Sequence, residues 1–182
     1  SYSTQHISIA QKADLFIVVP ATANFIAKAV HGICDDMLTT TFLACDCPKL
    51  IAPAMNTKMY TNPVTQDNLR LCEKYGYDII SPVSGHLACG DTGIGKLAAL
   101  DQLMDAIEEG LVKEKPLNGK KVLINAGPTR EKIDPVRFLS NHSSGKMGYS
   151  LAKAARNLGA EVTLVSGPTQ LKAPRNIDVI HI

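Results

Sequence analysis

The order of hydrophobic and polar positions predicts strands that alternate with helices. Leu15–Val19 is an unbroken apolar run rich in branched residues, which is typical of a strand covered on both faces. Pro20 is expected to end this strand, and the apolar spacing over Phe25–Ile33 then predicts a helix. A strand, a tight turn and a helix form the repeating unit of a parallel α/β sheet.

The same alternation continues to about residue 112. Lys49–Ala52 reads as the next strand, and Asn62 followed by Pro63 marks the start of a helix that runs to about Tyr75. Ser81–Leu97 differs because it holds four glycines among polar residues and has no period, so we expect a long loop there. The remaining elements expected in this part are helices over Met37–Ala44 and Ala98–Val112 and a strand over Tyr77–Ile80.

A second unit follows a charged segment with Pro and Gly, Lys113–Lys120, which reads as a linker. Strands over Lys121–Ala126 and Glu161–Ser166 flank an amphipathic helix, Tyr149–Leu158, and predict one right-handed βαβ crossover. Gly127–Gly148 is expected to be a long polar loop. We therefore expect two domains, residues 1–114 and 115–182. Both read as parts of larger domains, because the first begins with a helix fragment and a central-type strand, and the second alone buries too little surface to be stable.

Composition narrows the class of protein. The net charge is +2 and acidic and basic residues are interspersed, so no nucleic-acid partner is indicated. No apolar run approaches the ~20 residues of a membrane helix. None of the five cysteines forms a C-x-x-C pair, which argues against a zinc site or a disulfide framework and favours a reduced, cytoplasmic protein. They are Cys34, Cys45, Cys47, Cys72 and Cys89.

Polar residues follow two of the predicted strands. The segment Pro20–Asn24 reads PATAN, where small residues would let the backbone approach a flat ring or a phosphate and Thr22 could donate to it. Asn56 follows the second strand and offers two donors and an acceptor to an anion or carbonyl. Open α/β sheets bind ligands at the carboxyl ends of their strands. The alternative is structural, since Thr22 and Asn56 are both good helix N-caps.

Three further stretches are candidates for chemistry. His6 offers an acid/base near neutral pH, or is structural. Cys89, in flexible polar sequence, offers a proton donor or nucleophile, or is a buried thiol. The run from Ser143 to Lys146 would present hydroxyls, backbone N–H groups and a cation to a phosphate at a helix start. It lacks the Walker A spacing, and serine capping beside an incidental lysine is the alternative.

Taken together, these stretches resemble known families. His6 with Ala13–Leu15, PATAN, PAMNTKMY at Pro53–Tyr60 and ACGDTGIGKL at Ala88–Leu97 resemble the flavin-dependent cysteine decarboxylases. GPTRE at Gly127–Glu131, the segment Asp134–Gly148 and VTLVSGP at Val162–Pro168 resemble the phosphopantothenate–cysteine ligases. Both in this order are similar to the bifunctional coenzyme A biosynthesis proteins of bacteria. The fold implied is α/β, with a flavodoxin-like parallel-sheet unit followed by the start of a Rossmann-like ligase domain.

The resemblance also implies the reactions. One is FMN-dependent decarboxylation of phosphopantothenoylcysteine to phosphopantetheine, in which the cofactor carries the difficult redox step. The other joins phosphopantothenate to cysteine with CTP, and Mg²⁺ would accompany the triphosphate. Trimeric decarboxylase units, able to assemble into a dodecamer through ligase dimers, are implied as well. Two alternatives stay open: a non-catalytic flavin-binding or regulatory subunit, and a decarboxylase of peptidyl cysteine.

The resemblance assigns a role to each matching residue. His6, Asn56, Cys89 and Asn141 are implied to be catalytic, with Asn56 also holding the substrate carboxylate, Cys89 supplying a proton and Asn141 turning over an acyl-cytidylate. In the decarboxylase unit, the residues implied to line FMN are Pro20, Ala21, Thr22, Ala23, Asn24 and Ala52, and Met59 would contact substrate. In the ligase unit, those implied to hold CTP are Gly127, Ser143, Ser144, Gly145 and Lys146. One departure is Lys96-Leu97, where the family has Arg-Met, because lysine loses the bidentate geometry of arginine.

Overall fold

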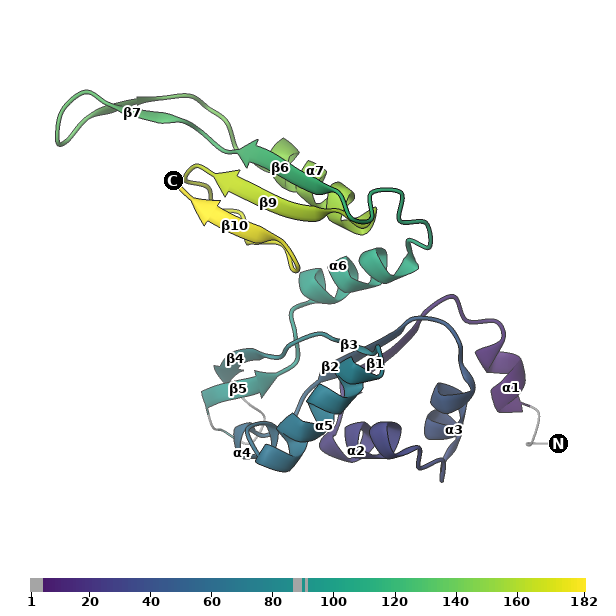
Figure 1. Cartoon of the computed structure of the whole chain (residues 1–182). Coiled ribbons are helices and arrows are strands. Elements are labelled where there is room, and N and C mark those ends of the chain that lie inside the picture. Colours follow the sequence, from purple (N-terminus) through teal and green to yellow (C-terminus); the bar gives the residue numbers. More distant parts are fainter. Residues whose placement is uncertain (1–4, 87–89, 91) are drawn as a thin grey trace. The chain divides into compact units, whose positions relative to one another are not determined.

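The computed structural model describes residues 5–86, 90 and 92–182, and the chain divides into two compact units. The first unit ends at Leu111 and the second begins at Val112. Figure 1 shows the elements of each unit, which are described separately below.

The first unit is built on three parallel strands in the order β1-β2-β3. Pairs such as Ile17 with Leu50 and Ile51 with Ile79 set the register, and the carboxyl ends of β1 and β2 reach the same edge. β1 continues past the predicted stop at Pro20 because an irregularity between Val18 and Ala21 lets the chain resume pairing with β2. The strands are β1 (Phe16–Ala21), β2 (Lys49–Pro53) and β3 (Asp78–Ile79).

Helices cover both faces of this sheet. Val18 and Ile51 face α2, α3 and α5, whereas Leu50 and Ala52, on the opposite face, pack with α6. This is the buried parallel sheet that the unbroken apolar runs predict. The helices of the unit are α1 (Gln5–Ala10), α2 (Ala23–His31), α3 (Met37–Ala44), α4 (Thr57–Tyr60), α5 (Pro63–Lys74) and α6 (Leu100–Leu111).

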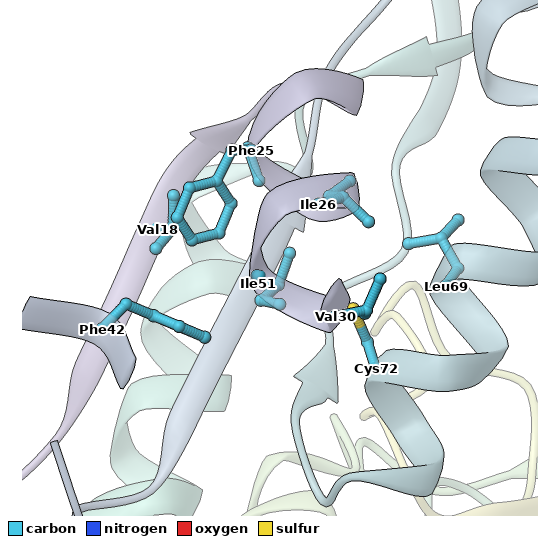
Figure 2. Close-up of a cluster of buried hydrophobic side chains, with 10 residues drawn as sticks. Val18, Phe25, Ile26, Val30, Phe42, Ile51, Leu69 and Cys72 are labelled. Carbon is cyan, nitrogen blue, oxygen red and sulfur yellow. The ribbon is translucent and has the colours of Figure 1, made fainter. Parts of the chain in front are cut away.

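The larger core cluster of this unit lies between β1, β2 and the three helices α2, α3 and α5 (Figure 2). Phe42 lies at one end of it, 1% exposed, and its ring meets the Phe25 ring edge-on with centroids 5.2 Å apart. The cluster fixes the helices that follow β1 and β2, and so fixes the turns at the carboxyl ends of those strands. Its labelled members in Figure 2 are Val18, Phe25, Ile26, Val30, Phe42, Ile51, Leu69 and Cys72.

The prediction of a loop over Ser81–Leu97 is wrong. β4 (Val83–His86) and β5 (Thr92–Lys96) form an antiparallel hairpin in which Gly85 pairs with Gly93. The strands were not recognised because their glycines interrupt the alternation of apolar and polar residues that marks a strand. Cys89 lies outside the described residues, together with its neighbours Leu87, Ala88 and Asp91.

The second unit has three parallel strands in the order β10-β9-β6. The structure places β6 (Lys121–Ala126) and β9 (Glu161–Ser166) where the sequence predicts them, whereas β10 (Asp178–His181) was not predicted. α7 (Lys146–Asn157) covers one face and begins three residues before the predicted start. Its Tyr149 and Ala152 pack on Val162 and Leu164 of β9.

The long loop predicted over Gly127–Gly148 is also partly wrong. β7 (Arg130–Lys132) and β8 (Phe138–Ser140) form a second antiparallel hairpin. Its turn is held by Asp134, whose Oδ1 accepts from the backbone N–H of Arg137 at 2.6 Å. All six strand residues are exposed, and the two apolar ones, Phe138 and Leu139, are adjacent, so no alternation of apolar and polar residues marks these strands in the sequence.

Candidate functional site

The segments that follow β1 and β2 meet at the carboxyl edge of the first sheet. The backbone N–H of Ala54 donates to the carbonyl oxygen of Ala21 at 3.1 Å. Ala21 and Ala52 are completely buried, so they let the two strand ends approach but expose no surface to a ligand. Pro20, Thr22 and Asn24 are exposed at this edge, and Ala23 is half-buried.

Both polar residues at this edge cap helices. Thr22 Oγ1 accepts from the N–H of Phe25 at 3.2 Å, and Asn56 Oδ1 accepts from the N–H of Lys58 at 2.8 Å. The structural alternatives for both residues are therefore confirmed. The cap engages the oxygen of Asn56, so an anion held here would meet its Nδ2 donors.

The hairpin β4–β5 docks directly on the PAMN segment. The N–H of Met55 donates to the carbonyl oxygen of Gly95 at 3.0 Å. Gly95 has φ +134°, and a Cβ there would lie 2.2 Å from the Met55 oxygen. A Cβ on Gly93 would lie 2.5 Å from Thr57 Oγ1, which is buried and has no hydrogen-bond partner among the described residues. Two glycines are thus required for β5 to lie beside Asn56.

His6 is not brought to this edge within one chain. It is half-buried on α1, whose last residue, Ala10, accepts a hydrogen bond from the Cys45 thiol at 3.4 Å. Cys45 precedes β2 and Asn56 follows it, and a five-residue strand spans about 16 Å. Figure 1 accordingly shows α1 and α4 on different sides of the first unit.

The remaining candidates of the first unit lie near the carboxyl edge of its sheet or outside the described residues. Met59 is 50% exposed on α4, one turn after Asn56. Lys96, at the end of β5, lies along β4, since its Cδ is 3.1 Å from where a Cβ on Gly85 would be. The position of Cys89, the predicted proton donor, is not described.

In the second unit, three segments meet through glycines. Gly127 follows β6 with φ +81°, and Gly145 precedes α7 with φ +77°. A Cβ on Gly145 would lie 3.2 Å from the Gly127 nitrogen, and one on Gly167 would lie 2.1 Å from the Pro128 oxygen. The start of α7 therefore sits directly against the carboxyl ends of β6 and β9.

Two cavities open where these segments meet. One, of about 530 Å³, is lined by Ser143, Ser144, Lys146 and Thr169 together with Arg130. The other, of about 640 Å³, shares both serines and Lys146 and adds Gly127 and Gly145. The five residues predicted for the ligase nucleotide are thus brought together. Two cations, hydroxyls and a helix start favour a polyanion.

The serine-cap alternative is not what the structure shows at α7. Its N-cap is Gly145, with no side-chain cap bond. The Ser143 and Ser144 hydroxyls accept from the N–H groups of Gly145 and Lys146 only at 3.4 and 3.5 Å, which are long for hydrogen bonds. The serine hydroxyls are therefore suited to an added ligand.

Arg130 and Thr169 were missed as site residues. Arg130 lies four residues after β6 ends, and its guanidinium lies 4.5 Å from the Phe138 ring centroid. An arginine so close to the carboxyl end of a strand is the signal that could have found it. Asn141 is exposed, and its Oδ1 accepts from the N–H of Ser143 at 2.9 Å, so it shapes the turn before the cavity.

Within residues 5–86, 90 and 92–182, no three His, Cys, Asp or Glu side chains gather as a metal site would need. Across the same residues, no helix has both the length and the apolar character to cross a membrane.

Comparison with known families accounts for this arrangement. Residues 1–112 match the family model described as flavoprotein. The chain belongs to the flavoprotein family. Residues 117–182 match the C-terminal domain of the DNA/pantothenate metabolism flavoproteins. The first matched range ends one residue into the second compact unit, and the second range begins five residues later.

Two relatives among those found are similar over nearly the whole chain. The coenzyme A biosynthesis bifunctional protein CoaBC of Vibrio vulnificus (strain YJ016) is 50% identical over 180 residues, 99% of this chain and 45% of that protein. A cysteine/cysteine sulfinic acid decarboxylase from an unknown prokaryotic organism is 47% identical over 97% of this chain and 51% of its own length. The chain thus spans about half the length of these relatives.

Solved structures match more than half of the chain. A cysteine-to-serine mutant of PPC decarboxylase, complexed with pantothenoylaminoethenethiol, has a TM-score of 0.55 and 36% identity over 56% of this chain and 57% of that one. The FMN-dependent cysteine decarboxylase SpaF has a TM-score of 0.51 and 39% identity over 59% and 56%. The predicted flavodoxin-like α/β fold is confirmed.

Proposed function

We propose that the first unit is the FMN-dependent decarboxylase part of a coenzyme A biosynthesis enzyme, acting on phosphopantothenoylcysteine in the cytoplasm. The observation that carries this proposal is the docking of β5 on the PAMN segment through Met55 and Gly95, which positions a hairpin beside Asn56. The PPC decarboxylase and the FMN-dependent SpaF, which share this fold, support it.

The exposed PATAN edge suits a flat cofactor. The small side chains at the strand ends leave room for a flat ring. Thr22 remains exposed there, although it caps α2. Pro20, Thr22, Ala23 and Asn24 would hold FMN, and the buried Ala21 and Ala52 would support that surface from below. When bound, FMN supplies the two-electron chemistry that this decarboxylation needs.

The protein's own groups bind substrate and move protons. Asn56 would donate through Nδ2 to the substrate carboxylate, and Met59 would contact the substrate from α4. His6 would act as the acid/base and Cys89 would return a proton to the product. Since His6 and Asn56 lie at different ends of β2, a shared site would take them from different copies in a homo-oligomer, for example a trimer.

For the second unit, we propose nucleotide binding in a fused CTP-dependent ligase. Arg130 and Lys146 carry the positive charges of the 530 Å³ cavity, and Ser143 and Ser144 line it beside the start of α7. These groups would hold the phosphates of CTP, with Mg²⁺ neutralising the rest of their charge. Asn141 would assist turnover of the acyl-cytidylate formed from phosphopantothenate before cysteine is added.

A second candidate is decarboxylation of free cysteine or cysteine sulfinic acid. It is favoured by the relative of that name, which matches 97% of this chain and so spans both units. Equal amounts of the full-length protein supplied with phosphopantothenoylcysteine or free cysteine would separate the two substrates. A peptide ending in cysteine tests the remaining alternative, decarboxylation of peptidyl cysteine. If no CO₂ is released from any of these substrates, a regulatory flavin-binding role is favoured.

The proposal is tested by the visible spectrum and CO₂ release of the full-length protein. We expect flavin absorption, and we expect CO₂ from phosphopantothenoylcysteine. His6→Asn should keep the flavin bands and lose at least about a hundredfold in rate, the usual range for general acid–base catalysis. A colourless protein that cannot take up added FMN, or a fully active His6→Asn variant, would contradict the proposal.

A further inference from the structure

Cys45 and Cys47 form a pair of thiols in the turn between α3 and β2. Their Sγ atoms lie 3.0 Å apart, and both cysteines are free. A disulfide bond is about 2.0 Å long, so closing the pair needs a movement of about 1 Å. Neither residue belongs to the PATAN, PAMN or hairpin segments.

The two sulfurs differ in exposure. Cys45 is 2% exposed, whereas Cys47 is partly exposed beside the exposed Asp46. Burial, followed by the hydrogen bond to Cys45, raises the pKa of Cys47 to about 11, and nearby Lys49 acts in the opposite direction. Cys47 is thus a protonated thiol near neutral pH that a small reagent can reach and that reacts slowly.

Cys45 also supports α1. Its thiol donates to the carbonyl oxygen of Ala10, the last residue of α1, at 3.4 Å. A sulfur in a disulfide carries no hydrogen and cannot donate this bond. The chemical state of the pair is therefore linked to the anchoring of the helix that carries His6.

We propose that Cys45 and Cys47 are a modification site at which a low-molecular-weight disulfide forms a reversible protein disulfide. The Cys47 thiol loses its proton, and the thiolate attacks the reagent's S–S bond, forms a mixed disulfide and releases one small thiol. The Cys45 thiol then loses its proton, attacks Cys47 Sγ and releases the second small thiol. Two protein thiols are oxidised, one small disulfide is reduced to two thiols, and both protons leave on the released thiols.

Residues two apart close only a small ring, so a small dithiol should easily reduce this disulfide. Its formation removes the Cys45 donor from Ala10. We expect the backbone amides of α1 to exchange hydrogen faster in the oxidised protein. This effect is independent of the decarboxylase proposal.

The test treats the full chain with oxidised glutathione, then blocks the remaining thiols and cleaves before aspartate. Cleavage before Asp46 separates Cys45 and Cys47 into peptides 36–45 and 46–66, and cleavage before Asp35 leaves Cys34 in a third peptide, 14–34. We expect 36–45 and 46–66 to remain joined, to have lost two hydrogens, and to separate after reduction. Only glutathione adducts, unmodified thiols or links to 14–34 would overturn the proposal.

Two variants sharpen this test. Cys34→Ser keeps the pair and should give the same joined peptides, whereas Cys47→Ser should give none. Oxidised wild type should show faster deuterium uptake at Gln5–Ala10 than its reduced form, and treated Cys47→Ser should not. Equal uptake in oxidised and reduced wild type would show that the pair does not anchor α1.

Discussion

Asn56 combines two functions at the residue scale, one structural and one proposed. Its oxygen caps α4, and its amide donors would meet the substrate carboxylate. The sequence pattern allows both possibilities, because an Asn after a strand can cap the next helix or bind a ligand. The residue type by itself favours the cap, and only the family resemblance assigns Asn56 to the substrate.

Asn56→Asp separates the two functions. Aspartate caps a helix as well as asparagine does, so stability to urea should change by less than about 0.5 kcal/mol. Its charge repels a carboxylate, so we expect KM for phosphopantothenoylcysteine to rise at least about tenfold. Asn56→Ala should also lose about 1 kcal/mol of stability, because alanine does not cap the helix. An unchanged KM in Asn56→Asp would remove Asn56 from substrate binding.

Cys72 gives the first unit a stability that depends on pH. It is 0% exposed in the core cluster, and burial, then the charge of Glu73, raises its pKa from 9.0 to about 11. Between these values the unfolded thiol loses its proton while the native thiol keeps it. We therefore expect the contribution of Cys72 to stability to be complete below about pH 9 and to fall by roughly 1–3 kcal/mol as pH rises towards 11.

Urea unfolding at pH 8 and at pH 10.5 measures this loss. Cys72→Ala should be less stable at pH 8 but should lose less between the two pH values than wild type does. Tyr77 and Cys47, whose pKa values burial also raises, should leave a remaining slope. Cys34→Ala, which removes an exposed thiol, should behave as wild type. A Cys72→Ala slope as steep as that of wild type would show that Cys72 is not responsible.

At the scale of elements, the sequence predicts those strands that a local pattern of apolar residues marks. β6 and β9 have the predicted bounds because their apolar residues mark them, and β2 ends one residue later. The hairpins β4–β5 and β7–β8 were missed, since the first is rich in glycine and the second wholly exposed. Contacts far apart in the chain, such as Met55 with Gly95, stabilise the first hairpin, and no local period encodes them.

Gly95→Ala tests the docking of that hairpin. The added Cβ would lie 2.2 Å from the Met55 oxygen at φ +134°, so β5 must shift away from the PAMN segment. We expect decarboxylation to fall at least about tenfold, a barrier change of about 1.4 kcal/mol. Gly76→Ala is the matched control, because Gly76 also has positive φ, +81°, but no atom of the described residues lies within 4 Å of its Cβ position. Equal losses would mean that backbone strain, not contact with Met55, is responsible.

At the scale of the whole molecule, the arrangement of His6 and Asn56 predicts sites shared between copies. A site that takes His6 from one chain and Asn56 from the next can be rebuilt from two inactive variants. We therefore expect a co-expressed mixture of His6→Asn and Asn56→Ala, purified through two different tags, to recover activity. In a randomly mixed ring, about one quarter of the sites pair an intact His6 with an intact Asn56.

The control for this mixture is each variant carrying both tags alone, which should stay inactive while binding flavin. If both residues act within one chain, every site in the mixture contains a defect, and activity stays at the level of the single variants. That result, in a mixed assembly proven to hold both tags and FMN, would require α1 to reach the carboxyl edge of its own sheet. The anchoring of Ala10 beside Cys45, at the amino end of β2, argues against such a movement.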